Sequence, residues 1–402
     1  MKNTVFIQFY SIINSSFSVL NGFSDTYDLC KNKGDFVWME NSGTDGAALP
    51  GETAKCSYIE DFPIDTGIAY ISCVYLSHFN QVYIWANLFP NVKFIVGGPL
   101  IDLNFSSIYI PQNNFSIPFN ITLSDKTVEE WFGVKNFSYE WKLVPPKIEK
   151  PYDLYFSYSL NNYCYWGKCI YCYQYCGQKN HIDREIFSFD FKNVEYDGKL
   201  QVRLTTSSLT PFHILKMIPN LSLTDKIKYY KGFIRCNSEE INLLKTIDPQ
   251  IIKKFLLTTG VEFPSTKMLK YMKKGATTKG LLQSFHTLRD LGCRFEFGMI
   301  LGWPNLDKQD IKELELFMQN IPDDMKHSKL LLYKLFCFSG SPIQNYLIKN
   351  PDKVYSVGPF ELGFYPELDQ EQLDLNEEAL NIIIKYCKIK NIYCNDRYSN
   401  VG

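Results

Sequence analysis

Four cysteines lie within thirteen residues of this 402-residue chain, in the stretch CYWGKCIYCYQYC, residues 164–176. Cys164, Cys169 and Cys172 have the spacing C-x4-C-x2-C, and Cys176 adds a further x3 step. A structural zinc site takes a second Cys or His pair from a separate segment, and the five isolated histidines do not provide one. Compact cysteine loops commonly hold iron-sulfur clusters. The stretch therefore favours a cluster, with zinc, a disulfide and inert buried thiols as the weaker alternatives.

Composition and charge narrow the classes of protein. The chain is 45% hydrophobic and 16% aromatic, enough for a substantial core, and its 42 basic and 43 acidic residues leave a net charge of -1. This balance gives no evident sign of a nucleic-acid partner. The sequence has no run of about 18 apolar residues and no signal-peptide pattern at its start. We therefore expect a cytoplasmic protein without a membrane segment, whose cysteines are reduced thiols.

Residues 1–105 alternate strand-like runs with turn signals. The runs are TVFIQFY, DFVWME, GIAYISCVYL and VKFIVGGPL, and residues 79–90 between the last two have apolar positions at helical spacing. This pattern predicts a small Rossmann-like domain with a parallel sheet. Residues 106–150 are rich in Asn, Ser and Pro and are expected to be a linker with local structure.

Residues 151–345 show a different and repeating pattern. Six strand-like runs, from LYFSYSL to LLLYKLFCF, alternate with helical stretches such as TTKGLLQSFHTLRDLG and DKQDIKELELFMQNI. The pattern predicts an α/β fold, a partial (β/α)6 TIM-type barrel. Residues 346–402 are expected to form a C-terminal helical extension. Chemistry in such barrels sits at the C-terminal ends of the strands, and the cysteine loop directly follows the first strand.

The loop and the later barrel half together resemble the radical SAM superfamily. The loop has an aromatic, Tyr171, just before its last cysteine. Residues 260–305 are similar to the branch that includes cobalamin-binding and methylthiolating enzymes, with a G-x-E strand end, a Lys-Gly turn and a G-x-P strand end. LFCFSGSPI, residues 335–343, resembles the G-[ST]-P turn of that branch. These ordered matches cover residues 152 to about 345.

The loop departs from the family at one point. The commonest family spacing is C-x3-C-x2-C, and this chain has one extra residue between Cys164 and Cys169. Cys169, Cys172 and Cys176 form an alternative triplet, but its spacing order is inverted relative to the family. The resemblance therefore favours Cys164, Cys169 and Cys172 as the metal ligands, with Cys176 nearby.

The resemblance implies the cofactors and the chemistry. Three thiolates leave one iron of a 4Fe-4S cluster open, and in the family S-adenosylmethionine binds there. One electron from a donor such as flavodoxin or ferredoxin then cleaves it to a 5'-deoxyadenosyl radical, while the protein supplies orientation and a dry cavity. An iron-sulfur protein for structure or electron transfer is the non-enzymatic alternative.

The resemblance also implies contacts to S-adenosylmethionine. Tyr171 is expected beside the adenine, and Glu262, at the end of the fourth barrel strand, accepts hydrogen bonds from the ribose hydroxyls or the methionine ammonium. Arg235, at the end of the third strand, would hold the methionine carboxylate in a charge-assisted pair. Barrel packing, surface exposure and an ordinary salt bridge are the respective alternatives.

Two further segments complete the expected binding site. Gly298, Ile300 and Gly302 match the adenine strand of the family, where small residues permit close approach. The family often has a G-G-E motif after strand two, where this chain has TTSSLTP, so Ser207 and its neighbouring hydroxyls are expected to receive the methionine ammonium.

The N-terminal domain and two cysteines decide the reaction subtype. Gly97 and Gly98 end a strand that resembles the end of a cobalamin-binding domain, but the D-x-H-x-x-G loop is absent. The resemblance therefore leaves open whether cobalamin is bound. With it we expect a C-methyltransferase, and without it hydrogen abstraction from a peptide or small-molecule substrate, as in peptide-modifying maturases. Cys337 or Cys394 would then return hydrogen to a substrate radical in an epimerisation, and an inert buried thiol is the alternative for each.

Overall fold

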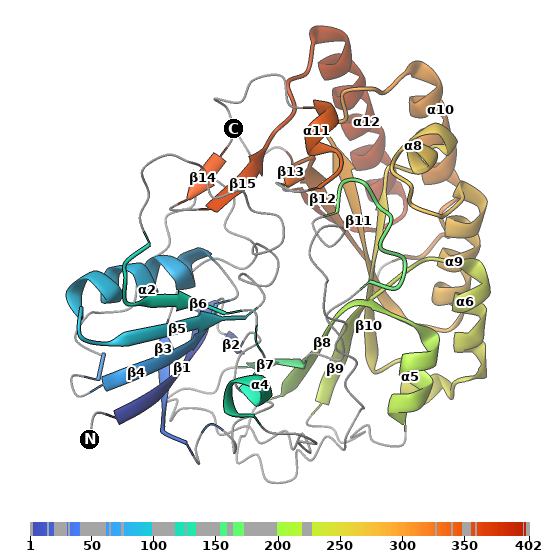
Figure 1. The fold of residues 1–402 in the computed structure, drawn as a ribbon. Helices are drawn as coiled ribbons and strands as arrows, with labels where there is room; N and C mark the ends of the chain where they lie inside the picture. Colours follow the sequence, from blue (N-terminus) through green and yellow to red (C-terminus); the bar gives the residue numbers. More distant parts are fainter. Residues whose placement is uncertain are drawn as a thin grey trace.

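The computed structural model describes residues 3–13, 16–19, 30, 33–40, 62–63, 66–73, 76–98, 117–124, 126, 128–133, 153–158, 164–172, 199–218, 227–325, 328–338, 341–347, 355–357, 360–396 and 398. In Figure 1 the blue N-terminal sheet lies on the left and the green-to-red barrel strands with their outer helices lie on the right. The expected Cys176 lies outside the described residues.

The N-terminal part is a parallel sheet covered on both faces. Its parallel strands are β1 (Asn3–Ile13), β3 (Asp35–Glu40), β4 (Thr66–Ser72), β5 (Lys93–Gly97) and β6 (Ile121–Leu123). Helix α2 (Leu76–Leu88) covers one face and the short α4 (Val128–Phe132) the other. Successive side chains of a strand point to opposite faces, so Phe9 of β1 stacks on Trp85 of α2 while Phe6 faces Phe132 of α4. Strand β6 lies in the stretch expected to be a linker and extends this sheet.

The barrel strands pair in the order of the sequence. They are β7 (Asp153–Tyr158), β8 (Leu200–Leu209), β9 (Ile227–Ile234), β10 (Phe255–Glu262), β11 (Arg294–Leu301) and β12 (Lys329–Lys334), and every neighbouring pair is parallel. Strands covered on both faces are buried along most of their length and are rich in apolar residues, as β10 and β11 are. The predicted α/β class, a partial barrel preceded by a small parallel sheet, is confirmed.

A short strand that the sequence pattern does not predict joins the two sheets. Strand β2 (Ser16–Val19) pairs antiparallel with β1 and parallel with β7. Within the described residues the barrel and the N-terminal strands therefore form one continuous sheet, which has thirteen strands when β16 of the tail is included. At the other edge β16 (Tyr393–Asp396) adds to β12, so the tail supplies a strand as well as its expected helix.

Helices follow the barrel strands on the outside of the sheet (Figure 1). They are α5 (Pro211–Met217), α6 (Ser238–Leu243), α7 (Pro249–Ile252), α8 (Thr266–Tyr271), α9 (Thr278–Asp290), α10 (Lys308–Asn320), α11 (Gln344–Leu347) and α12 (Gln370–Ile389). Helix α10 buries Ile311, Leu314, Phe317 and Met318 at helical spacing, and Asp307 caps its N-terminus. A small antiparallel sheet of β13 (Cys337–Phe338), β15 (Phe360–Phe364) and β14 (Tyr355–Val357) follows β12.

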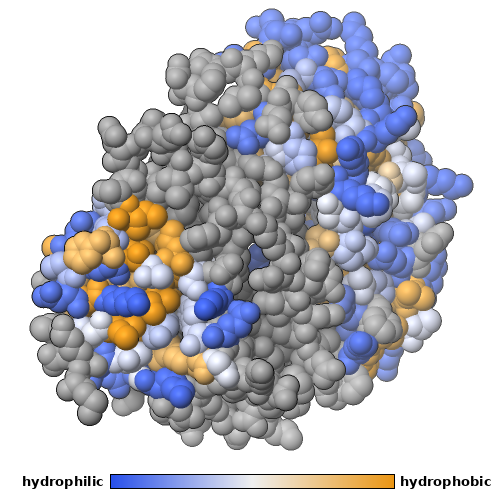
Figure 2. Space-filling view, viewed as in Figure 1, coloured by the Kyte–Doolittle hydropathy of each residue, from blue (hydrophilic) through white to orange (hydrophobic). Residues whose placement is uncertain are grey.

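The surfaces of the two parts differ in polarity. Figure 2 shows hydrophobic residues gathered on the N-terminal part, whereas the outer barrel helices are largely hydrophilic. Helix α2 exposes Ile84 and Leu88 while it buries Val82 and Trp85. Among the described residues no helix has the length and apolar character needed to cross a bilayer.

Candidate cofactor site

The cysteine loop, residues 164–172, is bonded to two other parts of the barrel. The Ile170 amide donates to the Met272 carbonyl at 3.2 Å, just after α8, and the Ile170 carbonyl accepts from the Ile343 amide at 3.0 Å, just before α11. The Trp166 indole Nε1 donates to the Lys273 carbonyl at 2.8 Å. The loop is therefore held at the C-terminal ends of the barrel strands.

Trp166 lies in the four-residue spacer between Cys164 and Cys169, and its ring packs against specific neighbours. Its ring meets the Arg235 guanidinium at 4.2 Å, a cation-π contact, and the Arg235 Nη2 donates to the Lys274 carbonyl at 2.6 Å. Gly275 has φ +66, and a Cβ there would lie 2.1 Å from the Trp166 ring. The Lys-Gly turn thus leaves room for this tryptophan, which gives the C-x4-C insertion a physical role.

Tyr171, Glu262 and Lys274 form one buried polar cluster. The Tyr171 hydroxyl donates to Glu262 Oε1 at 2.9 Å, and Lys274 Nζ lies 2.8 Å from the same oxygen and 3.0 Å from the Tyr171 hydroxyl. The Lys274 and Glu262 side chains are only 13% and 11% exposed. A buried carboxylate is costly unless it is paired, and here the lysine and the phenol supply its partners.

The backbone of β10 is shaped to hold this carboxylate. Glu262 has φ +66, a left-handed conformation that is uncommon for a residue other than glycine, and the β10–β11 register shifts between Gly260 and Glu262. A Cβ on Gly260 would lie 1.9 Å from Glu262 Oε1 and 2.9 Å from Lys274 Nζ. The glycine of the G-x-E motif therefore makes space for the ion pair, because the Glu262 side chain folds back over it.

Burial and charge set the ionisation of the cluster. Burial lowers the pKa of Lys274, but the Glu262 carboxylate and the neighbouring Cys169 and Cys172 outweigh it, so the pKa is raised. Burial, followed by the charge of Glu262, raises the pKa of Tyr171 well above its ordinary value. Burial also raises the pKa of the Cys169 thiol, although the Lys274 charge opposes the shift. Tyr171 is therefore a neutral donor and Lys274 a cation.

The chemistry of the cysteine loop fits an iron-sulfur cluster. Cys164, Cys169 and Cys172 are half-buried cysteines on one nine-residue loop, and soft thiolates are the ligands of such clusters. In the described residues no three His, Cys, Asp or Glu side chains are gathered closely enough to hold a metal ion. Cluster binding would require the three thiols to release their protons.

Strand β11, which is predicted to contact the adenine, is followed by a turn that contains Trp303. Gly298 and Ile300 lie in β11 beside β10, with Gly260 opposite Gly298, and Gly302 follows with φ +89. Trp303 is fully buried, and its indole Nε1 donates to the Ile300 carbonyl at 2.8 Å. Its ring meets Tyr171 edge-on at 6.0 Å between centroids. The strand thus contacts the cysteine loop through Trp303.

The remaining predicted residues are Cys337, Cys394 and Ser207. They lie less close to the polar group of Tyr171, Glu262 and Lys274, or their side chains are outside the described residues. Cys337 is fully buried in β13, and burial raises the pKa of its thiol to about 12. Cys394 pairs in β16 with Leu330, near the start of β12 and thus at the opposite end of the strands from the cysteine loop. Its thiol is hydrogen-bonded with Cys387, which lowers the pKa of Cys394. Ser207 lies in β8, but its side chain is outside the described part.

The glycines of the N-terminal domain form a tight turn beneath an aromatic ring. Gly98 has φ +95, and a Cβ on Gly97 would lie 2.9 Å from the ring of Trp131. On the other face, His78 of α2 is stacked on Phe9 at 4.4 Å between ring centroids. The amide of Gln81 and the indole N–H of Trp85, both fully buried, have no hydrogen-bond partner within the described part of the chain. A buried polar group without a partner is costly and points to a missing one.

Several residues of the site were not assigned a role by the sequence. The sequence marks Lys274 and Gly260 only as motif positions, and it marks neither Trp166 nor Trp303 as a site residue. The signal for Lys274 was its place after G-x-E, because a buried carboxylate needs a cation. Nothing local in the sequence marked Trp303, whose role depends on the contact between β11 and the cysteine loop.

Solved structures share this fold at low sequence identity. The cobalamin-dependent S-adenosylmethionine radical enzyme OxsB, solved with aqua-cobalamin and S-adenosylmethionine, matches with a TM-score of 0.61 and 12% identity over 95% of this chain. This chain spans 66% of OxsB, slightly less than two thirds of its length. The radical S-adenosylmethionine methyltransferase TsrM from Kitasatospora setae, solved with cobalamin and a 4Fe-4S cluster, matches with a TM-score of 0.59 and 9% identity over 98% of this chain and 91% of its own. No protein-family model and no curated protein matches the sequence.

Proposed function

We propose that this protein, which has the fold of cobalamin-dependent radical SAM enzymes, is itself a radical SAM enzyme. Cys164, Cys169 and Cys172 hold a 4Fe-4S cluster and leave one iron for S-adenosylmethionine. The observation that carries the proposal is the hydrogen bond by which Tyr171 of the cysteine loop reaches the buried carboxylate of Glu262. A cysteine loop that only held a structural metal would need no such buried polar side chains beside it.

The bound cofactors supply a 5'-deoxyadenosyl radical that removes a hydrogen atom from a substrate. The residues of this chain bind and orient. Tyr171 lies beside the adenine, and Glu262 has one carboxylate oxygen engaged by Tyr171 and Lys274, which leaves its second oxygen for a ribose hydroxyl or the ammonium. Arg235, fixed through the Lys274 carbonyl and Trp166, offers its remaining guanidinium N–H groups to the methionine carboxylate.

The backbone of β11 completes the proposed adenine site. A Cβ on Gly298 would meet its nearest neighbours at 3.8 Å or more, an ordinary van der Waals distance, so the backbone there is not crowded. Ile300 follows on the same strand, and Gly302 comes just after the end of it. The substrate is a peptide or a small molecule, and an electron donor such as flavodoxin or ferredoxin reduces the cluster.

A second candidate is a cobalamin-dependent C-methyltransferase. The unpartnered Gln81 amide and Trp85 indole favour it, because a bound corrinoid would supply the missing hydrogen-bond partners. TsrM is a methyltransferase solved with cobalamin, and this chain spans 91% of it. Gln81 and Trp85 of α2 would hold the corrinoid. Retention of stoichiometric corrinoid by the protein after gel filtration favours this candidate, and loss of the corrinoid counts against it.

Anaerobic reconstitution with iron and sulfide tests the main proposal. We expect about four irons per chain, as in a single 4Fe-4S cluster. On reduction with dithionite and S-adenosylmethionine, 5'-deoxyadenosine should form, as measured by liquid chromatography. Iron incorporation without any cleavage of S-adenosylmethionine would instead identify an iron-sulfur protein for structure or electron transfer.

A further inference from the structure

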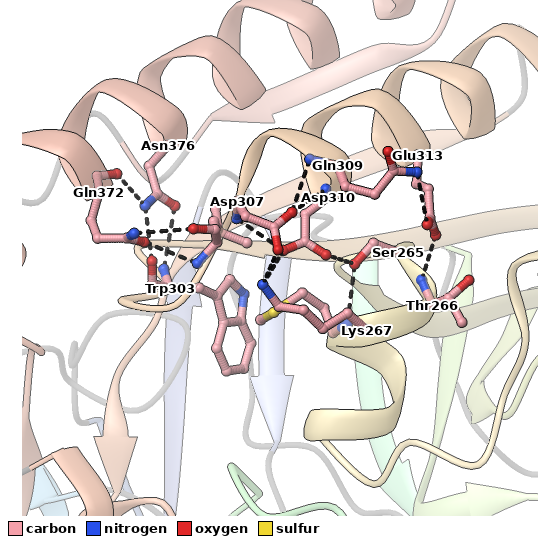
Figure 3. Close-up of polar contacts among 12 residues, drawn as sticks. Ser265, Thr266, Lys267, Trp303, Asp307, Gln309, Asp310, Glu313, Gln372 and Asn376 are labelled. Atoms are coloured by element: carbon pink, nitrogen blue, oxygen red, sulfur yellow. Dashed lines mark hydrogen bonds and ion pairs between the residues drawn. The ribbon is translucent and has the colours of Figure 1, made fainter.

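Two amide side chains of α12 hold the turn that follows β11. Asn376 is fully buried, and its Oδ1 accepts from the Gly302 amide at 2.7 Å and from the Trp303 amide at 3.3 Å. Its Nδ2 donates to the Trp303 carbonyl at 3.0 Å. One turn of helix earlier, Gln372 accepts from the Leu306 amide at 2.9 Å and donates to the Leu306 carbonyl at 3.0 Å. Figure 3 shows both amides reaching from α12 to this segment.

The turn needs such support, because little in its own backbone fixes it. Gly302 has φ +89, and the strand ends one residue earlier, so the amides of Gly302 and Trp303 have left the β-ladder. On the other side, Asp307 begins α10 and is paired with Lys267 at 2.6 Å. The turn is therefore held between α12 and the start of α10, as Figure 3 shows.

The turn places the tryptophan that contacts the cysteine loop. The Trp303 indole donates to the Ile300 carbonyl and its ring meets Tyr171 edge-on, at 6.0 Å between centroids. It also meets Tyr271 at the end of α8, at 6.4 Å. A shift of Trp303 would therefore move the Tyr171 ring and the C-terminal end of β11 together.

We propose that Asn376 and Gln372 are positioning residues for S-adenosylmethionine, which act through the Gly302–Leu306 turn and Trp303 on Tyr171. This inference rests on the proposed function, because it gives a remote helix a part in that binding site. It assigns the C-terminal helix α12 a role beyond covering the barrel.

Equilibrium binding of S-adenosylmethionine to the reconstituted protein tests the proposal. Gln372→Met keeps the length of the side chain and removes both bonds to Leu306, and Asn376→Ala removes the bonds to Gly302 and Trp303. We expect the dissociation constant for S-adenosylmethionine to rise about tenfold in Asn376→Ala and less in Gln372→Met, with the cluster absorbance unchanged. Gln372→Glu retains one acceptor and should lie between wild type and Gln372→Met.

Two controls separate positioning from loss of stability. Ile383→Ala removes a buried side chain of the same helix two turns away, and Tyr386→Phe removes bonds from α12 to Gln319 and Glu315 of α10. Both should retain the wild-type affinity at a temperature well below their unfolding. Amide hydrogen exchange of residues 301–306 without any ligand should quicken in Asn376→Ala and not in Tyr386→Phe.

The outcomes are distinct. If wild type binds S-adenosylmethionine and Gln372→Met and Asn376→Ala bind it equally well, the positioning role is wrong and the proposed function stands. An affinity loss in Ile383→Ala as large as in Asn376→Ala would also overturn it, since general destabilisation would then explain both. If Asn376→Ala does not fold, the S-adenosylmethionine affinities of the Gln372 variants decide whether the positioning role is right. If wild type itself binds no S-adenosylmethionine, the proposed function fails, and the inference fails with it.

Discussion

The C-terminal end of β10 and the inner face of α2 both bury polar side chains, but they treat them differently. At β10 the carboxylate of Glu262 is matched by Lys274 and by the Tyr171 hydroxyl, all within 3.0 Å. On α2 the Gln81 amide and the Trp85 indole N–H have no partner in the described part of the chain. At the end of β10 the buried polar groups satisfy one another, whereas on α2 two buried polar side chains are left without a hydrogen-bond partner among the described residues.

The difference teaches how each part relates to a ligand. A network in which every buried polar group has a partner fixes side-chain positions before anything binds. A cofactor at the end of β10 would therefore meet side chains that are already in place. An unmatched buried amide costs roughly 1–3 kcal/mol, which a bound group can recover by supplying a partner. The stability of the α2 layer should therefore respond to a corrinoid, and that of the β10 edge should depend on its own residues.

The largest expected effect is at the cysteine loop. Replacing any of Cys164, Cys169 or Cys172 by Ala should abolish the iron-sulfur absorbance and the formation of 5'-deoxyadenosine, because in the proposed function each thiolate would be an iron ligand. Cys293→Ala, a buried thiol at the start of β11, should retain both. Cluster retention in Cys164→Ala together with its loss in Cys176→Ala would instead assign the alternative triplet.

Breaking the matched pair at β10 is the next test. Glu262→Gln leaves the buried Lys274 without its counter-ion and should lower the free energy of unfolding by about 3 kcal/mol. It should also weaken S-adenosylmethionine binding by tenfold or more, a loss of about 1.4 kcal/mol, in an equilibrium titration.

Glu296→Gln is the matched control for that pair. Glu296 lies 2.6 Å from Lys231 near the start of β11, with side chains that are 11% and 21% exposed. It should cost a similar stability in urea unfolding and leave S-adenosylmethionine affinity unchanged. Equal loss of affinity in both variants would mean that the cluster at β10 has no special part in binding.

Replacing the unpartnered Gln81 amide on α2 should change the free energy of unfolding in the opposite direction from the variants at β10. Gln81→Met has a similar shape without the polar atoms, so in the protein free of corrinoid it should raise the free energy of unfolding by about 1–3 kcal/mol. With cobalamin present, the wild type should gain stability and the variant should gain less. If cobalamin stabilises both equally in thermal unfolding, the orphaned amide is unrelated to a corrinoid.

The smallest effect is a pH dependence of the α2 layer. Burial lowers the pKa of His78 to about 3, below its ordinary value of 6.5. The unfolded chain therefore binds the proton first, so the stability from the neutral ring is complete above pH 6.5 and is lost as the pH falls, by about 1.4 kcal/mol per unit. His78→Phe should flatten this slope in hydrogen exchange of α2 between pH 7 and 5. His286→Asn, an exposed position on α9, should retain the slope.

The sequence predicted the barrel well because its signals are local. The strand ending in Glu262 and the helix after it are a strong apolar pattern, and the covered parallel strands of β10 and β11 could be read directly from it. The pairing of β2 with β7 could not be, because residues 16–19 make contacts with a strand more than 130 positions away. Non-local pairing is not written in any short stretch.

The candidate site was predictable only in its motif residues. Tyr171 and Glu262 were expected at the cofactor for separate reasons, and the structure joins them by a hydrogen bond. The role of Gly260 could not be foreseen, since it depends on the Glu262 side chain folding back over it. Cys394 was a candidate from residue type alone, and the register of β16 places it at the other end of the strands.

The open iron is the central claim, and electron paramagnetic resonance of the reduced cluster tests it most directly. The one-electron-reduced protein should show the signal of a single 4Fe-4S cluster, and addition of S-adenosylmethionine should shift its g-values, because the amino and carboxylate groups bind the iron that lacks a cysteine. A reduced cluster whose spectrum is the same with and without S-adenosylmethionine, in protein that holds all its iron, would contradict the account.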